Sequence, residues 1–277
     1  EKGVNPVALQ LGGSNPAELA QCAKWGEEAG FDEINLNCGC PSPRVQSGDF
    51  GVVLMLSPQK VADCLKAMQD SVSVPVTVKH RIGVDDQTSY GFVRDFVGTV
   101  HEAGTRVFIV HARAAWLKGL SPKENRDIPP LDRELAARLK ADFPDSIFVV
   151  NGGIKTLSEC QTELNRFDGV MLGREAYNNP WLLTEVDHAL YGDPESTLSR
   201  DEVVEQMADY VDLVQEREPL AARTAVNHLM GLALGLPGGA RHWRRLLTDP
   251  ALWKTKKAGE IVRLAWKEVK PEAGLED

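Results

Sequence analysis

The feature that most constrains the fold is a regular alternation of short strands and longer helices along the first two thirds of the chain. Runs rich in Val and Ile are typical of buried strands, and the segments between them have the apolar spacing of amphipathic helices. We predict six strands, at residues 7–11, 33–36, 76–79, 107–111, 147–150 and 170–172. Such alternation indicates an α/β fold with a parallel sheet.

The helices between these strands have recognisable ends. Residues 16–28 follow two candidate capping residues, Ser14 and Asn15, and residues 58–69 begin at a proline that follows Ser57. After Trp181 the strand pattern stops, and four further helices are predicted at residues 200–216, 222–234, 241–247 and 252–269. We therefore expect two domains, at residues 1–192 and 193–277, divided at the turn formers Gly192, Asp193 and Pro194.

Most of the predicted strands end in a polar residue or a glycine. Functional side chains at the carboxyl ends of the strands are typical of a (β/α)8 TIM barrel. In such a barrel the phosphate site usually follows strands seven and eight. The loops Asn151-Gly152-Gly153 and Gly173-Arg174 would then be those two, and the first two βα units are expected upstream of Glu1. The alternative is a complete doubly wound sheet, although its phosphate site would normally follow the first strand.

Composition narrows the class of protein. With 277 residues, 43% of them hydrophobic, the chain can bury a full core. No run of about 18 apolar residues and no leader pattern is apparent, so we expect a cytoplasmic protein. The net charge of −9 opposes nonspecific coating of nucleic acid, which rests on many Lys and Arg contacts to phosphate, but allows a local basic surface.

Five cysteines, an odd number without framework spacing, fit a reducing compartment. Cys40 follows a strand in a turn forced by Gly39 and Pro41, so its thiol is expected at the barrel mouth. A metal site is not predicted, because Cys38 and Cys40 lack the second Cys or His pair that zinc normally needs. The remaining cysteines are expected to pack in the interior: Cys22, Cys38, Cys64 and Cys160.

Several motifs, in order along nearly the whole chain, resemble the tRNA-dihydrouridine synthase family. They are Leu36-Asn37-Cys38-Gly39-Cys40-Pro41-Ser42, Val78-Lys79-His80-Arg81, Val110-His111-Ala112-Arg113, Asn151-Gly152-Gly153 and Val170-Met171-Leu172-Gly173-Arg174. Two further stretches resemble the A-type subfamily: Asn125-Arg126-Asp127-Ile128-Pro129-Pro130-Leu131 and Ala240-Arg241-His242-Trp243-Arg244-Arg245.

This resemblance implies an FMN enzyme that reduces uridine to 5,6-dihydrouridine in the D-loop of tRNA, at position 20/20a, with NADPH as reductant. Carried over by position, the acid is Cys40, and the flavin contacts are Gln10, Lys79, His111, Asn151, Gly152, Gly153, Gly173 and Arg174.

The chemistry of uracil supports these roles. Hydride addition at C6 places enolate charge on the C4 carbonyl and leaves C5 to be protonated, so one hydride donor and one acid suffice. An acid must hold its proton at working pH, so we expect Cys40 to lie away from strong positive charge. Lys79 would stabilise negative charge on the reduced ring, and His111 would donate to the flavin or the substrate carbonyl or belong to the barrel wall.

A uracil in folded tRNA must be flipped out to react. Asn37 and Arg126 are candidates for its polar edge, and Lys118 and Lys123 lie on the same long loop as Arg126. Positions 241, 244 and 245 share one helical face, so their arginines would form a basic patch for phosphate contacts, with a plain solvated face as the alternative.

Two other functions stay open. One is an FMN barrel acting on a free pyrimidine, similar to dihydroorotate dehydrogenase, which would gain nothing from a basic helix. The other is a noncatalytic RNA-binding fragment, which would hold no flavin.

Overall fold

The computed structural model describes residues 6–270, which form two compact units: residues 6–154 with 158–172, and residues 155–157 with 173–270. The first unit contains one parallel sheet with strands in chain order: β1 (Ala8–Leu11), β2 (Glu33–Cys38), β3 (Val76–Arg81), β4 (Val107–His111), β5 (Ile147–Asn151) and β6 (Gly169–Met171). Sequential parallel strands joined by helices are the arrangement of a TIM barrel, as predicted. All six predicted strands are confirmed within two residues at each end.

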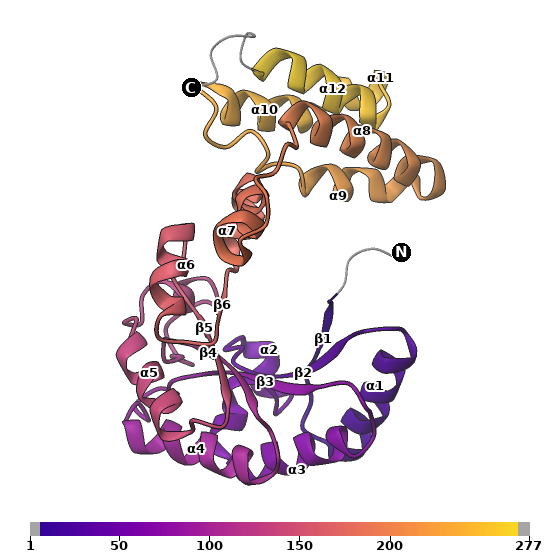
Figure 1. Ribbon diagram of the computed structural model, residues 1–277. Helices are drawn as coiled ribbons and strands as arrows, with labels where there is room; N and C mark the ends of the chain where they lie inside the picture. The colour runs from indigo at the N-terminus through magenta and orange to yellow at the C-terminus, as the bar shows by residue number, and fades with distance from the viewer. Residues whose placement is uncertain (1–5, 271–277) are drawn as a thin grey trace. The chain divides into compact units, whose positions relative to one another are not determined.

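Helices cover one face of this sheet (Figure 1). They are α1 (Pro16–Glu28), α3 (Pro58–Gln69), α4 (Tyr90–Glu102), α5 (Arg133–Asp142) and α6 (Leu157–Leu164). Short elements occupy the loops: α2 (Pro43–Ser47), η1 (Gly51–Leu56) and η2 (Glu124–Arg126). The cap of α1 is Asn15, whose Oδ1 accepts the N–H groups of Ala17 and Glu18, whereas Ser57 makes no side-chain cap at α3.

The two faces of the sheet differ in burial. Side chains toward the helices, such as Ile34, Val78 and Phe108, are completely buried. On the opposite, inner face, Ile147 and Met171 are 49% and 37% exposed. Within residues 6–270, β1 and β6 each pair with one neighbour only, so the sheet does not close and its inner face is open. That the two missing units lie upstream stays a prediction.

The second unit is helical. Its elements are α7 (Arg174–Asn178), η3 (Pro180–Glu185), η4 (Asp187–Tyr191), α8 (Arg200–Arg217), η5 (Pro219–Ala221), α9 (Ala222–Asn227), α10 (Gly239–Leu247), α11 (Leu252–Thr255) and α12 (Ala258–Val269). Trp243 is fully buried in its core, 6.0 Å from the Trp266 ring and bonded through Nε1 to the carbonyl of Leu229. The predicted boundary near Gly192 falls between η4 and α8, and the domain assignment stays a prediction.

Two helix predictions were too long. Helix α9 ends at Asn227, and tight turns follow in which Gly231 approaches the backbone closely: a Cβ there would lie 2.5 Å from the carbonyl oxygen of Asn178. The stretch 252–269 is divided into α11 and α12. The N–H groups of Ala258 and Gly259, at the start of α12, are bonded to side chains of α8, so this new helix start is capped by a neighbour.

Candidate functional site at the carboxyl ends of the strands

Cys40 lies in a short loop after β2 that is held by hydrogen bonds. Oδ1 of Asn37 accepts the N–H groups of Gly39 and Cys40, both at 3.0 Å, in the manner of an Asx turn. The carbonyl of Cys40 accepts the N–H of Val52 at 3.0 Å. The thiol is partly buried, with Sγ 3.6 Å from Oγ of Ser42. The loop therefore holds a partly accessible thiol in a defined place.

The other cysteines mostly pack, as predicted. Cys38, Cys64 and Cys160 are buried, and burial raises the pKa of each of their thiols, that of Cys64 to about 11. Cys22 is partly buried. Deprotonation near neutral pH is thus unfavourable for the three buried thiols.

Arg81 belongs to the motif Val78-Lys79-His80-Arg81, but no role in the site was predicted for it from the sequence. Its buried guanidinium donates to the carbonyls of Gly39 (2.9 Å), Ala114 (3.0 Å) and Asn125 (2.9 Å), so it ties together the loops after β2 and β4. The signal in the sequence was an arginine at the end of a buried strand. Its three partners are main-chain atoms, which no motif reveals.

Arg81 also bears on an expectation about Cys40. Burial lowers the pKa of Arg81 to about 10. The loop carbonyl that Arg81 binds belongs to the residue before Cys40. The expectation that the Cys40 thiol lies away from strong positive charge stays a prediction.

Four predicted flavin or substrate residues meet on the inner face of the sheet. Nδ2 of Asn37 donates to Oε1 of Gln10 at 2.9 Å, and Nζ of Lys79 donates to Oδ1 of Asn151 at 3.2 Å. Asn37 and Lys79 are register partners across β2 and β3. Burial, and then the cation of Arg81, lower the pKa of Lys79 to about 8. This lysine is partly buried on the inner face of the sheet, and its role in binding flavin stays a prediction.

The glycine pair after β5 approaches its surroundings closely. Gly152 and Gly153 have φ of 118° and 71°, a region that favours glycine. A Cβ at Gly152 would lie 2.7 Å from Cδ2 of His111, which is itself buried. His111 and Asn151 are register partners, so the histidine, the amide and the two glycines form one group.

A second arginine missed from the sequence holds this glycine loop. Nη2 of Arg133 donates to the carbonyl of Gly152 at 2.9 Å, and Nη1 pairs with Oε1 of Glu163 at 3.1 Å. Glu163 is 5% exposed, unusual for a carboxylate on a helix that covers a sheet. The sequence signal for this pair was an acidic residue, Glu163, on the apolar side of a predicted helix.

The long loop after β4 presents its cations outward. Lys123 and Arg126 are exposed, and Arg126 is near enough to Arg81 to lower its pKa. Asn125 between them is fully buried, with its side chain bonded to both the N–H and the carbonyl of Trp116. An internal anchor thus fixes a loop with a basic outer surface.

The other predicted residues belong to the second unit, which is described by itself. Gly173 precedes Arg174 at the start of α7. On α10 the side chains of Arg241, Arg244 and Arg245 are exposed, while Trp243 on the opposite face is buried. The predicted basic face of this helix is confirmed as a surface; its role in binding stays a prediction.

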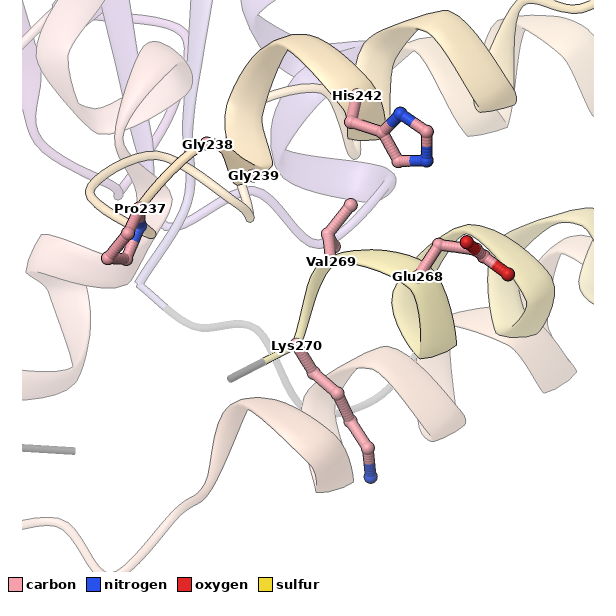
Figure 2. A pocket seen from close by; sticks show the side chains of 7 residues that line it. All are labelled: Pro237, Gly238, Gly239, His242, Glu268, Val269 and Lys270. Carbon is pink, nitrogen blue, oxygen red and sulfur yellow. The ribbon is translucent and has the colours of Figure 1, made fainter. Parts of the chain in front are cut away.

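A cavity of about 530 Å³ lies in the helical unit, between the start of α10 and the end of α12 (Figure 2). None of the predicted site residues lines it; the lining consists of Pro237, Gly238, Gly239, His242, Glu268, Val269 and Lys270. Within residues 6–270 there is no cluster of three metal-ligating side chains and no helix long and apolar enough to cross a membrane.

Comparisons with known proteins agree with the motifs. The family model "Dihydrouridine synthase (Dus)" matches residues 1–267. A tRNA-dihydrouridine(20/20a) synthase of Pseudomonas putida is 58% identical over 244 residues, covering 88% of this chain and 72% of that protein. The same-named protein of Shewanella oneidensis is 51% identical over 269 residues, covering 97% and 79%.

Among solved structures, a 2-naphthoyl-CoA reductase matches with a TM-score of 0.50 and 12% identity, over 61% of this chain and 28% of that one. This likeness concerns the fold alone. The sequence relatives decide the family, because they cover most of both chains at more than half identity. The chain belongs to the dihydrouridine synthase family, in its A-type subfamily.

Proposed function

We propose that this protein reduces uridine to 5,6-dihydrouridine in the D-loop of tRNA, at position 20/20a, with FMN as cofactor and NADPH as reductant. The observation that carries the proposal is the joint placement of a partly accessible thiol, a partly buried lysine and a glycine pair on one rim of a parallel sheet. In a barrel this rim is where substrates bind. The relatives' names supply the nucleotide position.

The residues present are suited to a flavin mononucleotide. The two glycines form a turn with positive φ whose backbone N–H groups would bind the phosphate, and Arg133, paired with Glu163, holds that loop in place. Arg174 would add a cation. Lys79, with Gln10, Asn151 and His111, would hold the ring, since a buried amine is a strong partner for negative charge. What FMN supplies when bound is hydride donation.

The protein's own part in the reaction is to place and protonate the base. Asn37 and Arg126 would hold the polar edge of the flipped uracil, with C5 toward Cys40. The Cys40 sulfhydryl would then give its proton to C5 as general acid. Arg81 would keep the loop of Cys40 fixed and, as a cation, would stabilise the thiolate that remains. The nearby cation is thus compatible with an acid that must release its proton.

Contacts to the rest of the tRNA would come from exposed basic side chains. These are Lys123 on the long loop and Arg241 with Arg244 on α10. Cations on a surface suit phosphate contacts, and the net charge of −9 on the chain would suppress binding elsewhere. An enzyme for a free pyrimidine has no use for the basic face of α10.

The test is mass spectrometry of nucleosides from unmodified tRNA incubated with the protein, FMN and NADPH. We expect dihydrouridine at position 20 or 20a, and none when either FMN or NADPH is omitted. Absence of dihydrouridine from the complete mixture, with flavin bound to the protein, would contradict the proposed function. Conversion of free dihydroorotate or uracil instead would favour the small-molecule alternative.

A further inference from the structure

Five polar side chains on the inner face of β1, β2 and β3 form one continuous hydrogen-bonded chain. Gln10, Asn35 and Thr77 are register partners in one row across the three strands. Glu33 lies one layer below them on β2 and Asn37 one layer above. Barrel interiors are usually filled by branched apolar side chains, so a polar row at this position calls for a reason.

The bonds run in one direction. Thr77 Oγ1 donates to Oε1 of Glu33 at 2.5 Å, and Nδ2 of Asn35 donates to that same hydroxyl oxygen at 2.8 Å. Nε2 of Gln10 donates to Oδ1 of Asn35 at 2.7 Å, and Nδ2 of Asn37 donates to Oε1 of Gln10 at 2.9 Å. Every link therefore has its donor on the side of Asn37 and its acceptor on the side of Glu33.

The chain ends at the Cys40 loop. Because the Nδ2 of Asn37 is turned toward Gln10, its Oδ1 is turned toward the loop, where it accepts the N–H groups of Gly39 and Cys40. If the Asn37 amide were reversed, its Nδ2 group would face the N–H groups of Gly39 and Cys40. Two donors cannot bond, so the loop would be released. The orientation of one amide thus decides whether the thiol is held.

Glu33 sets that orientation. An ionised carboxylate can only accept, so the Thr77 hydroxyl must donate to it and must accept from Asn35. Asn35 must then donate through Nδ2 to Thr77 and accept through Oδ1 from Gln10. Gln10 in turn accepts through Oε1 from Asn37. Asn35 and Thr77 are 3% and 1% exposed, so water cannot replace the bond between these two if it is made the wrong way, whereas the last link, from Asn37 to Gln10, is exposed.

We propose that Glu33, Thr77 and Asn35 are positioning residues for Cys40. They fix the polarity of a hydrogen-bond relay that ends in the side-chain amide of Asn37, and Oδ1 of this amide holds the loop that carries the acid. The relay also leaves Asn37 as a hydrogen-bond donor on the substrate side, which suits a carbonyl oxygen of the base. The catalytic meaning of the relay rests on the proposed function; its effect on the loop does not.

The test removes one hydroxyl without changing the shape of the side chain. Thr77→Val breaks the relay in its middle and suits a buried strand. Thr77→Ser keeps the hydroxyl and should restore the relay. The matched control is Thr105→Val, since Thr105 is fully buried and its hydroxyl accepts from Gln69 at 3.0 Å, outside the relay. If Thr77→Val does not fold, Glu33→Gln takes its place, because a glutamine no longer enforces the direction.

The first measurement is hydrogen exchange of the full chain without tRNA. In Thr77→Val the Gly39 and Cys40 amides should exchange about tenfold faster than in the wild type, the effect of losing roughly one hydrogen bond. Thr77→Ser and Thr105→Val should leave these two amides within about twofold of the wild type. Unchanged exchange in Thr77→Val, or an equal increase in Thr105→Val, would overturn the relay.

The second measurement is dihydrouridine formation by the flavin-loaded protein at saturating tRNA. We expect kcat to fall about tenfold in Thr77→Val, with the Kd for tRNA unchanged and with recovery in Thr77→Ser. Faster exchange with an unchanged kcat would overturn the positioning role. If the wild type forms no dihydrouridine, the proposed function fails, and hydrogen exchange alone decides whether the relay holds the loop.

Discussion

The buried amine of Lys79 should make the stability of the protein depend on pH in a defined window. Its pKa in the folded chain is about 8, against an ordinary value of 10.5. Below about pH 8 both the folded and the unfolded chain carry the proton, so burying the charge opposes folding by about 3 kcal/mol, at about 1.4 kcal/mol per pH unit. Between pH 8 and 10.5 the folded chain loses its proton first, and stability rises with pH.

Lys79→Met should abolish this rise. The variant also loses the 3.2 Å hydrogen bond to Asn151, which is worth about 1 kcal/mol. At about pH 7 it should therefore be about 2 kcal/mol more stable than the wild type, and at about pH 10.5 about 1 kcal/mol less stable.

Urea unfolding of the flavin-free protein at about pH 7, 9 and 10.5 measures this difference, in which the titration of all other groups cancels. The matched control is Lys118→Met, which removes an exposed amine from the long loop. A difference between Lys79→Met and the wild type that stays constant across the three pH values would refute the reasoning.

Three further predictions concern the site. Cys40→Ala should retain FMN, measured by fluorescence titration, while its rate of dihydrouridine formation falls at least about 100-fold, the usual contribution of a general acid. Gly152→Ala should lower the free energy of unfolding by about 2 kcal/mol more than Gly119→Ala. Both glycines have positive φ, but only a Cβ at Gly152 meets a ring, and equal losses would contradict the close approach. Arg241→Glu with Arg244→Glu should weaken tRNA binding at least about tenfold in a filter assay and leave NADPH-dependent flavin reduction intact; unchanged tRNA binding would show that α10 is only a solvated face.

Local sequence signals predicted the sheet well, because its strands are buried by helices. Residues 107–111 form a short apolar run between two amphipathic stretches, which predicts a buried strand. The strand β4 has those same bounds. The start of α12 within the stretch 252–269 was not predictable, since its first N–H groups are bonded to side chains of α8. The bounds of a strand follow from its own residues, whereas this helix start depends on contacts with a segment far away in the sequence.

The same distinction applies to the site. Cys40 and Lys79 stand in motifs and could be singled out from the sequence. Arg133 and Thr77 stand in no motif, and the role of Arg81, although it belongs to the motif of Lys79, was not assigned, because their partners are carbonyls and side chains that become neighbours only in the folded sheet. The sequence thus predicted the residues proposed to touch flavin and substrate, and the structure added the residues that hold them.

The central claim is that Cys40, and not the nearby Cys38, protonates the base during its reduction. Its most direct test is a single-turnover measurement in which the flavin is first reduced and then mixed with tRNA, and reoxidation of the flavin is followed by absorbance without oxygen. The wild type and Cys38→Ala, which changes a fully buried thiol, should reoxidise at rates within about twofold of each other, whereas Cys40→Ala should be at least about 100-fold slower. Reoxidation by tRNA at the wild-type rate in Cys40→Ala would contradict the account.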